Sequence, residues 1–400
     1  MGNIKEDCYV VPGFTTNGIH SGIKENGLKD LALIFSAIPS KVSGVFTKNS
    51  FKAAPVLLDQ ERMRSGIAQA ILVNSGNANA ATGAKGYEDA VAMAKSASRH
   101  LHVGEELVLV ASTGIIGRRL PLQKIEAGMI HLVNGLNENG VHDAVEAIMT
   151  TDKFPKMSCR KGIISTKEIT LCGIAKGAGM IEPHMATMLA FLMTDVNIQP
   201  SVLNKIFKQA VDESFNAVTV DGCMSTNDTA IIMANGMGNN SAISGVSKDL
   251  FVFKEMLFSV TKDLAKSMVR DGEGATKIIE IIVEQAKSKR DAKKVAYAIA
   301  NSNLVKTAFF GCDPNWGRIL SAAGSSGIAI PIDAVELFYD DVSVFANGRA
   351  MQGHENELVS VMAKESVKVR LNLGMGKKGF SICTSDLTYD YVRINAHYHT

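Results

Sequence analysis

The chain has 400 residues, 46% of them hydrophobic, which is enough to bury a sizeable core and to form more than one domain. Its 42 basic and 40 acidic side chains leave a net charge of +2, so no overall field attracts nucleic acid or an acidic membrane. The 6 cysteines are scattered without a CxxC pair, and no Cys/His cluster has the spacing of a zinc set, which argues against a disulfide scaffold and against a metal site.

The amino terminus has no apolar stretch of the kind that forms the core of a secretory signal. Farther along, no apolar run reaches the ~20 residues that a helix needs to cross a bilayer. We therefore expect a soluble protein of the cytoplasm that binds neither membranes nor nucleic acid.

Two short apolar runs, 70–73 and 107–111, are typical of buried strands, and both lead into polar turns, Asn-Ser-Gly and Ser-Thr-Gly. A hydroxyl and an adjacent glycine amide at a strand end can point at one oxygen. Thr113 and Gly114 are therefore candidates for an oxyanion hole. An ordinary turn, in which the threonine hydroxyl bonds to a nearby backbone group, is the alternative for this pair.

The most distinctive segment, residues 176–190, reads KGAGMIEPHMATMLA. Its lysine and glycines followed by an apolar run predict a polar, glycine-shaped pocket wall that continues into the core. Thr187 lies at the boundary. Threonine is a weak nucleophile without a base, but its own α-amine supplies one once the Ala186–Thr187 bond is cut. On these residues alone, the alternative is a buried strand threonine bonded to a neighbouring backbone group.

Farther along, apolar residues at helical spacing predict a helix that Ser201 caps and that carries its stripe as far as Phe215. A second helix, with apolar residues at helical spacing over 253–268, should stop just before the turn at 271–274. Apolar and polar residues then alternate as in half-buried antiparallel strands. These strands are expected at 342–345, 367–371 and 389–394. The elements together predict a mixed α/β fold.

The segment KGAGMIEPHMATML resembles the processing and nucleophile segment of the ornithine acetyltransferase family, also called glutamate N-acetyltransferase. Other segments that resemble the same family follow one another over nearly the whole chain. They are 44–49 (GVFTKN), 74–80 (NSGNANA), 112–117 (STGIIG), 149–152 (MTTD), 219–222 (TVDG), 225–229 (STNDT), 271–277 (DGEGATK), 313–318 (DPNWGR) and 395–400.

The resemblance implies that the chain cuts itself between Ala186 and Thr187 into an alpha chain, 1–186, and a beta chain, 187–400, that begins with the nucleophile. It also implies a layered α/β sandwich whose two halves meet around Thr187. The implied assembly is a heterotetramer with two copies of each cleavage product.

The implied reaction is acetyl transfer from N-acetylornithine to glutamate through an acetyl-threonine, in the cyclic arginine pathway. The oxyanion donors of the family match Thr113 and Gly114. No cofactor is implied, and acetyl-CoA is a co-substrate if the enzyme is bifunctional and also acetylates glutamate directly. The implied substrate-binding residues are Thr150 or Thr151, Lys176, Thr187, Glu273, Asn395 and Thr400, with Lys176 suited to a carboxylate and Glu273 to the ornithine ammonium.

Two readings from other classes remain open at this point. One is a self-processing amidase or aminopeptidase with an amino-terminal threonine, in which water accepts the acyl group. The other is a binding protein without catalytic activity, in which the glycine-rich segment only shapes a pocket. A chain that stays in one piece would favour the second reading, and acetyl exchange that depends on glutamate would exclude the first.

Overall fold

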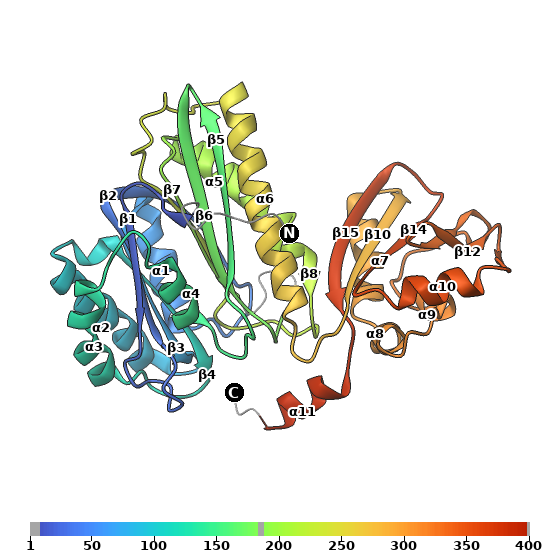
Figure 1. Cartoon of the computed structure of the whole chain (residues 1–400), viewed down its shortest axis with the longest axis horizontal. Coiled ribbons are helices and arrows are strands. Elements are labelled where there is room, and N and C mark those ends of the chain that lie inside the picture. The colour runs from blue at the N-terminus through green and yellow to red at the C-terminus, as the bar shows by residue number, and fades with distance from the viewer. Residues whose placement is uncertain (1–8, 183–187, 398–400) are drawn as a thin grey trace.

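The computed structural model describes residues 9–182 and 188–397, which form a larger and a smaller α/β unit side by side (Figure 1). Each unit is built on one sheet, of eight strands in the larger and seven in the smaller. No helix within these described ranges is long and apolar enough to cross a membrane. The mixed α/β class predicted from the sequence is confirmed.

The sheet of the larger unit has the order β4-β3-β2-β9-β7-β6-β5, with β1 paired to β2. The long strand β2 takes part in both halves of this sheet, the half with β3 and β4 and the half with β9, β7, β6 and β5. Its residues 31–35 pair with β3, and its residues 41–46 pair with β9. The strands are β1 (Phe14–Ile19), β2 (Leu31–Phe46), β3 (Ile67–Asn77), β4 (Val108–Ile115), β5 (Lys156–Ile164), β6 (Lys167–Lys176), β7 (Leu189–Thr194) and β9 (Thr229–Ala234).

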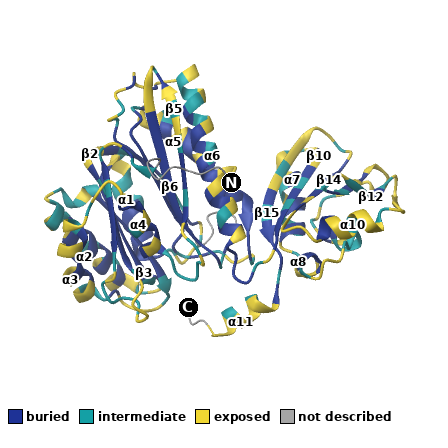
Figure 2. Ribbon diagram, in the orientation of Figure 1, coloured by how far each residue is buried: buried dark blue, intermediate teal, exposed yellow. Residues whose placement is uncertain are grey.

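Helices cover the outer faces of both halves of the sheet, and a separate hydrophobic core fills the space between the halves. Leu33 of β2 packs outward against α2 and α3, whereas its neighbour Ile34 packs inward against β7 and α4. Figure 2 shows β3 and β6 buried while the outer faces of α2 and α3 stay exposed. The helices are α1 (Ala54–Arg62), α2 (Gly83–Leu101), α3 (Leu122–Asn134), α4 (Val141–Ile148), α5 (Pro200–Asp212) and α6 (Lys248–Arg270). The result is the layered sandwich that the sequence predicted.

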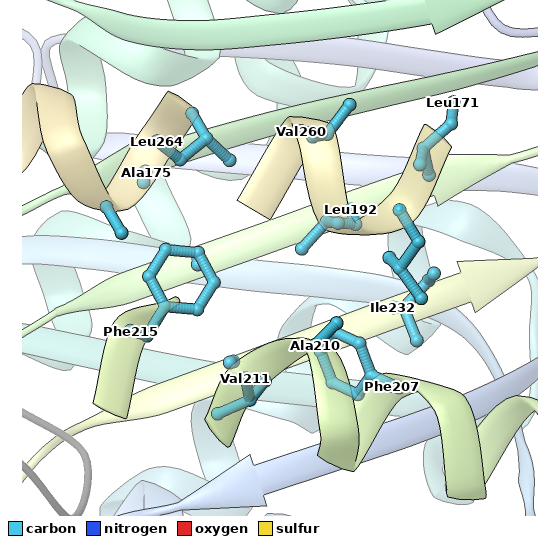
Figure 3. Close-up of a cluster of buried hydrophobic side chains, with 14 of the residues drawn as sticks. Leu171, Ala175, Leu192, Phe207, Ala210, Val211, Phe215, Ile232, Val260 and Leu264 are labelled. Carbon is cyan, nitrogen blue, oxygen red and sulfur yellow. The ribbon is translucent and has the colours of Figure 1, made fainter. Parts of the chain in front are cut away.

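The remaining outer face carries the largest core, in which α5 and α6 pack on strands β6, β7 and β9 (Figure 3). Phe207 of α5 and Leu264 of α6 meet Leu192 of β7 there, all of them fully or almost fully buried. Gly173 of β6 lies under α6, because an added Cβ would come within 2.8 Å of the Leu264 side chain. The absence of a side chain at this position lets the helix approach the sheet closely.

The smaller unit has the strand order β13-β12-β11-β14-β10-β15-β8, with a core between the sheet and its helices. Its strands are β8 (Val218–Thr219), β10 (Ile278–Ala286), β11 (Glu336–Tyr339), β12 (Val342–Ala346), β13 (Arg349–Ala350), β14 (Ser366–Asn372) and β15 (Lys378–Ser385). Its helices are α7 (Lys289–Ala300), α8 (Asn303–Phe310), α9 (Trp316–Gly324), α10 (Glu355–Met362) and α11 (Tyr389–His397).

Most predicted elements are present. The strands at 70–73, 107–111, 342–345 and 367–371 fall within β3, β4, β12 and β14, although the first residue of the second run, Leu107, lies just before β4. The second predicted helix is α6, which ends at Arg270 as expected.

The cap assigned to Ser201 is wrong. Helix α5 begins one residue earlier, at Pro200, and no side chain caps it. Proline suits this place because its fixed φ matches the helix and it lacks an N–H that would go unpaired in the first turn.

The strand predicted at 389–394 is wrong, because these residues begin the helix α11. Tyr389 and Val392 remain largely exposed, so alternation at this point does not mark a half-buried sheet face. Helical spacing instead places Tyr391 and Asn395 on one side, where the Tyr391 hydroxyl lies 3.3 Å from Asp221 Oδ2. In this way α11 reaches back from the smaller unit toward the larger one (Figure 1).

The predicted alpha and beta chains do not coincide with the two units. Ala186 and Thr187 lie outside the described residues, but the strands on either side of them share one sheet. Residues 171–176 of β6 pair antiparallel with 189–194 of β7, and β9 pairs with β2. After a cut before Thr187, both products would therefore still contribute paired strands to the sheet of the larger unit.

This pairing predicts that the two products stay together after a cut. With an affinity tag on the amino-terminal piece, both pieces should be recovered at high salt and should separate only in denaturant, because backbone ladders and buried apolar surface join them. The measurement is recovery of each piece by denaturing gel. Release of the carboxyl-terminal piece at high salt would contradict the shared sheet.

Candidate active site

A pocket of about 70 Å³ lies at the carboxyl ends of β3, β4 and β6. It is lined by every predicted site residue that falls within the described part of the chain. These are Thr113, Gly114, Thr150, Thr151, Lys176, Glu273 and Asn395. Ala186, Thr187 and Thr400, the other predicted site residues, lie outside the described residues. A wider cleft of about 610 Å³ between α6 and the strands β10 and β15 contains none of the predicted residues.

The Thr113–Gly114 pair sits where β3 and β4 run parallel. Gly114 is opposite Gly76 and has a φ of +131°, and an added Cβ would lie 2.3 Å from the Gly76 carbonyl carbon. Only glycine fits there. The side chain of Thr113 is buried, and its hydroxyl bonds to no residue in the described ranges, so it is available to a ligand in the pocket.

Side-chain hydrogen bonds fix the backbone of this turn. The Ser112 hydroxyl donates to Asn74 Oδ1 at 2.6 Å, and Asn74 Nδ2 donates to the carbonyl of Asn77 at 2.9 Å. Asn227 adds a link from across the sheet, because its Nδ2 donates to the carbonyls of Ala78 and Ser112 at 2.6 and 2.7 Å. Buried and satisfied bonds of this kind hold a donor pair in place.

Lys176 is the last residue of β6 and is only 3% exposed, yet its ammonium has no hydrogen bond or ion pair with any residue described here. Burial lowers its pKa, while the carboxyl groups of Asp152, Asp228 and Glu273 act in the opposite direction. A buried cation that lines a pocket without a partner is suited to receive an anionic ligand, and a carboxylate gives the shortest and strongest such bond.

Glu273 reaches the pocket from the turn after α6. Its N–H donates to the carbonyl of Ala178 at 2.9 Å, and its Oε2 accepts from Asn395 Nδ2 at 2.8 Å. A Cβ on Gly179 would lie 2.4 Å from the carboxyl carbon of Glu273, so the glycine lets this carboxylate approach the pocket wall. Asn395 of α11 thus contacts a predicted site residue directly.

Thr150 and Thr151 both line the pocket, so both remain candidates for the hydroxyl donor. The backbone N–H of Thr150 donates to Asp152 Oδ2 at 2.9 Å, which shapes the turn that carries the two threonines.

The chain on either side of residues 183–187 is firmly held. Asp221 accepts from the N–H groups of Met180 and Ile181 at 2.6 and 2.9 Å. On the other side, the N–H of Met188 donates to Asp228 Oδ1 at 3.2 Å, and its carbonyl accepts from the N–H of Thr229 at 3.0 Å. The chain before residue 183 and after residue 187 is therefore fixed by Asp221, Asp228 and Thr229, from the segment between β8 and the start of β9.

Sequence reasoning quoted the segment 225–229 but assigned no role to Asp228 or to the pocket-lining residues Ser225, Thr226 and Asn227. Asp228 is fully buried, and burial raises its pKa well above the usual range, which favours the neutral acid. A signal was present: these polar residues form an unbroken run directly before the apolar strand β9. Among residues 9–182 and 188–397, no group of three His, Cys, Asp or Glu side chains is placed to hold a metal ion.

Comparison with known proteins gives matches over the full length. The model of the ArgJ family matches residues 15–400. The arginine biosynthesis bifunctional protein ArgJ of Geobacter sulfurreducens is 50% identical over 395 residues, which cover 98% of this chain and 100% of that protein. The protein of the same name from Caldanaerobacter subterraneus is 47% identical over 97% of both chains. A crystal structure of the ArgJ bifunctional protein from Bacillus halodurans is 38% identical with a TM-score of 0.50, covering 52% of this chain and 98% of that one.

The geometry at Gly114 predicts a difference between two glycine substitutions. Gly114→Ala should destabilise the protein more than Gly117→Ala, because both residues have positive φ but only at Gly114 would the new Cβ strike backbone. The strained φ costs ~1–3 kcal/mol at either site, and the collision adds to it. Chemical denaturation measures both. Equal losses would contradict the close approach of β3 and β4.

Proposed function

The chain belongs to the ArgJ family, and on that premise we propose that it transfers an acetyl group from N-acetylornithine to glutamate through an acetyl ester on Thr187. This membership confirms the resemblance carried by the segment KGAGMIEPHMATML. Relatives that match over the full length are named arginine biosynthesis bifunctional proteins, which makes this chain an enzyme of that pathway.

The observation that carries the proposed substrate class is the Lys176 ammonium, which has no partner among the described residues and lines a pocket that also contains a carboxylate. Both amino-acid substrates have an α-carboxylate, which Lys176 can bind as a charge-assisted pair. Glu273, which lines the same pocket, matches the ammonium of the ornithine side chain. One pocket thus offers a partner to each charged end of ornithine.

The proposed reaction has two half-reactions at one nucleophile. The α-amine of Thr187 takes the hydroxyl proton, and the oxygen attacks the acetyl carbonyl of N-acetylornithine. The carbonyl oxygen becomes an oxyanion that Thr113 and Gly114 stabilise. The C–N bond then breaks, the proton passes to the departing nitrogen, and ornithine leaves. The amine of glutamate then attacks the carbonyl of the acetyl-threonine and passes a proton to the α-amine of Thr187. The ester C–O bond breaks, the threonine oxygen takes the proton back, and N-acetylglutamate leaves.

The base needs no histidine in this scheme. An α-amine titrates near pH ~7.7–8.0, so an appreciable fraction is neutral at working pH. Asp228 binds the N–H of Met188, the residue that follows Thr187 in the chain. Burial holds the Asp228 carboxyl group toward its neutral form, so it adds little negative charge that would keep an amine protonated.

The free amine requires the chain to be cut, and we include self-cleavage between Ala186 and Thr187 into chains 1–186 and 187–400 in the proposal. The match to a solved ArgJ chain that is almost fully covered by about half of this chain supports it. Cytoplasmic location, a heterotetramer with two copies of each product, and the use of acetyl-CoA as a second acetyl donor with no other cofactor belong to the same proposal.

The covalent step predicts a modified carboxyl-terminal piece. After mixing with N-acetylornithine alone, mass spectrometry should show a single acetyl group on residues 187–400, because one nucleophile holds the group between two substrates. Thr187→Ala should remain uncut and inactive.

Three outcomes of this experiment would contradict the proposal. Cleavage of Thr187→Ala at the same bond would exclude self-processing by this threonine. An unmodified piece, with kinetics that require both substrates bound together, would exclude the acetyl-threonine. Release of free acetate with no dependence on glutamate would identify an amidase.

The oxyanion assignment predicts the effect of Thr113→Ala. Loss of one donor should lower kcat by ~10²–10³ while KM changes little, because the bond strengthens in the transition state. Steady-state kinetics with N-acetylornithine and glutamate measure both constants, and a denaturing gel shows that the variant is still cut. If the cut variant keeps full kcat, Thr113 is only a turn residue.

A further inference from the structure

Beneath the pocket, Lys156 forms a buried ion cluster with two carboxylates. Its Nζ donates to Asp152 Oδ1 at 2.6 Å and to Asp271 Oδ2 at 2.5 Å, and all three side chains are fully buried. Lys156 does not line the pocket, so it contacts no ligand there. Burying three charges is costly, and removing one partner leaves the others unpaired, so such a cluster strongly constrains its surroundings.

The cluster joins three segments that carry predicted substrate-binding residues. Asp152 accepts from the N–H of Thr150 at 2.9 Å and from the N–H of Gly177, next to Lys176, at 2.7 Å. Asp271 caps the carboxyl end of α6 and is separated from Glu273 by one glycine. Lys156, on β5, is therefore the point at which the two threonines, Lys176 and Glu273 are tied together.

The cluster also decides what the Lys176 ammonium can bind. Asp152 is the carboxylate that acts most strongly on Lys176, yet no ion pair forms between them within the described chain. Burial opposes ionisation of Asp152, but the ammonium groups of Lys156 and Lys176 lower its pKa to about 2, so it is charged. Its Oδ1 is already occupied by Lys156 and Gly177, and its Oδ2 by Thr150.

We propose that Lys156 is a positioning residue for binding of the substrate carboxylate: by holding Asp152, it keeps the Lys176 ammonium free for the ligand. This inference rests on the proposed function in one respect, since it takes the ligand to be an amino acid with a free α-carboxylate. Without Lys156, the charge of Asp152 would be uncompensated, and Lys176 would become its counter-ion. The enzyme would then bind its own carboxylate in place of the substrate's.

The test is steady-state kinetics of the full-length, processed enzyme. Lys156→Met should raise KM for both N-acetylornithine and glutamate by about tenfold or more, the equivalent of one charge-assisted bond. It should leave kcat within about threefold, because the reacting atoms are untouched. The double variant Lys156→Met/Asp152→Asn should recover most of the lost affinity, because a neutral amide no longer competes for Lys176.

The matched control is Lys277→Met. Lys277 is also buried, but within the described residues its Nζ donates only to the carbonyls of Met362 and Lys364, in the smaller unit. Its loss should lower the melting temperature without changing KM. This separates a loss of stability from a loss of positioning, since a merely structural role for Lys156 would not be reversed by removing a second charge.

Wild-type KM values in Lys156→Met, or a KM that Asp152→Asn does not restore, would overturn the proposal. If Lys156→Met does not accumulate, Lys156→Gln decides, because its neutral amide also leaves the charge of Asp152 uncompensated: a tenfold rise in KM supports the proposal, and a wild-type KM contradicts it. If the unaltered enzyme shows no acetyl exchange, the proposed function fails instead. Calorimetric titration of the same variants with ornithine would then still test the role of Lys156.

Discussion

The ammonium of Lys176 is buried at the end of β6, and no group in the described chain accepts a hydrogen bond from it. An unpaired buried cation normally loses its charge or finds a partner. Two of the three nearby carboxyl groups are bonded to other residues: Asp152 to Lys156 and Glu273 to Asn395. Burial raises the pKa of the third, Asp228, and favours its neutral form. Among the charged groups of the site that the structure describes, the Lys176 ammonium is thus left without a bonded partner. The hydrogen bonds of Asp152 and Glu273 to other residues keep it available.

The sheet topology explains how such a set can stay ordered. Lys176, Thr113 and the turn before β9 all stand at strand ends of the larger unit, where residues distant in sequence meet. Strand β7 lies between β6 and β9, so the segment after Thr187 is held on both sides by backbone ladders. A chain cut before Thr187 would gain a free amine without losing the sheet on either side of the cut.

The predicted site residues that the structure describes line one pocket, whereas part of the predicted local structure around them is wrong. Strand ends with Ser-Thr-Gly and Lys-Gly-Ala-Gly carry chemistry that can be recognised from residue types, and the helix α6 follows from apolar spacing alone. The strand predicted at 389–394 is wrong because a short alternation of apolar and polar residues fits a helix as well as a strand when no face is buried. The helix there depends on contacts of Tyr391 and Asn395 with distant residues, which local pattern does not contain.

The same reasoning assigned no role to Asp228 or Lys156, and the cause is physical. A lysine seven residues after the Met149 of a loop motif, or an aspartate inside a polar run, is ordinarily a solvated side chain. What makes these two residues special is that the fold buries them beside other charges, and burial is a property of the assembled layers. Candidate groups for substrate binding can therefore be proposed from residue types and motifs. The buried charges that hold those groups in their working state become evident only when the sheets are in place.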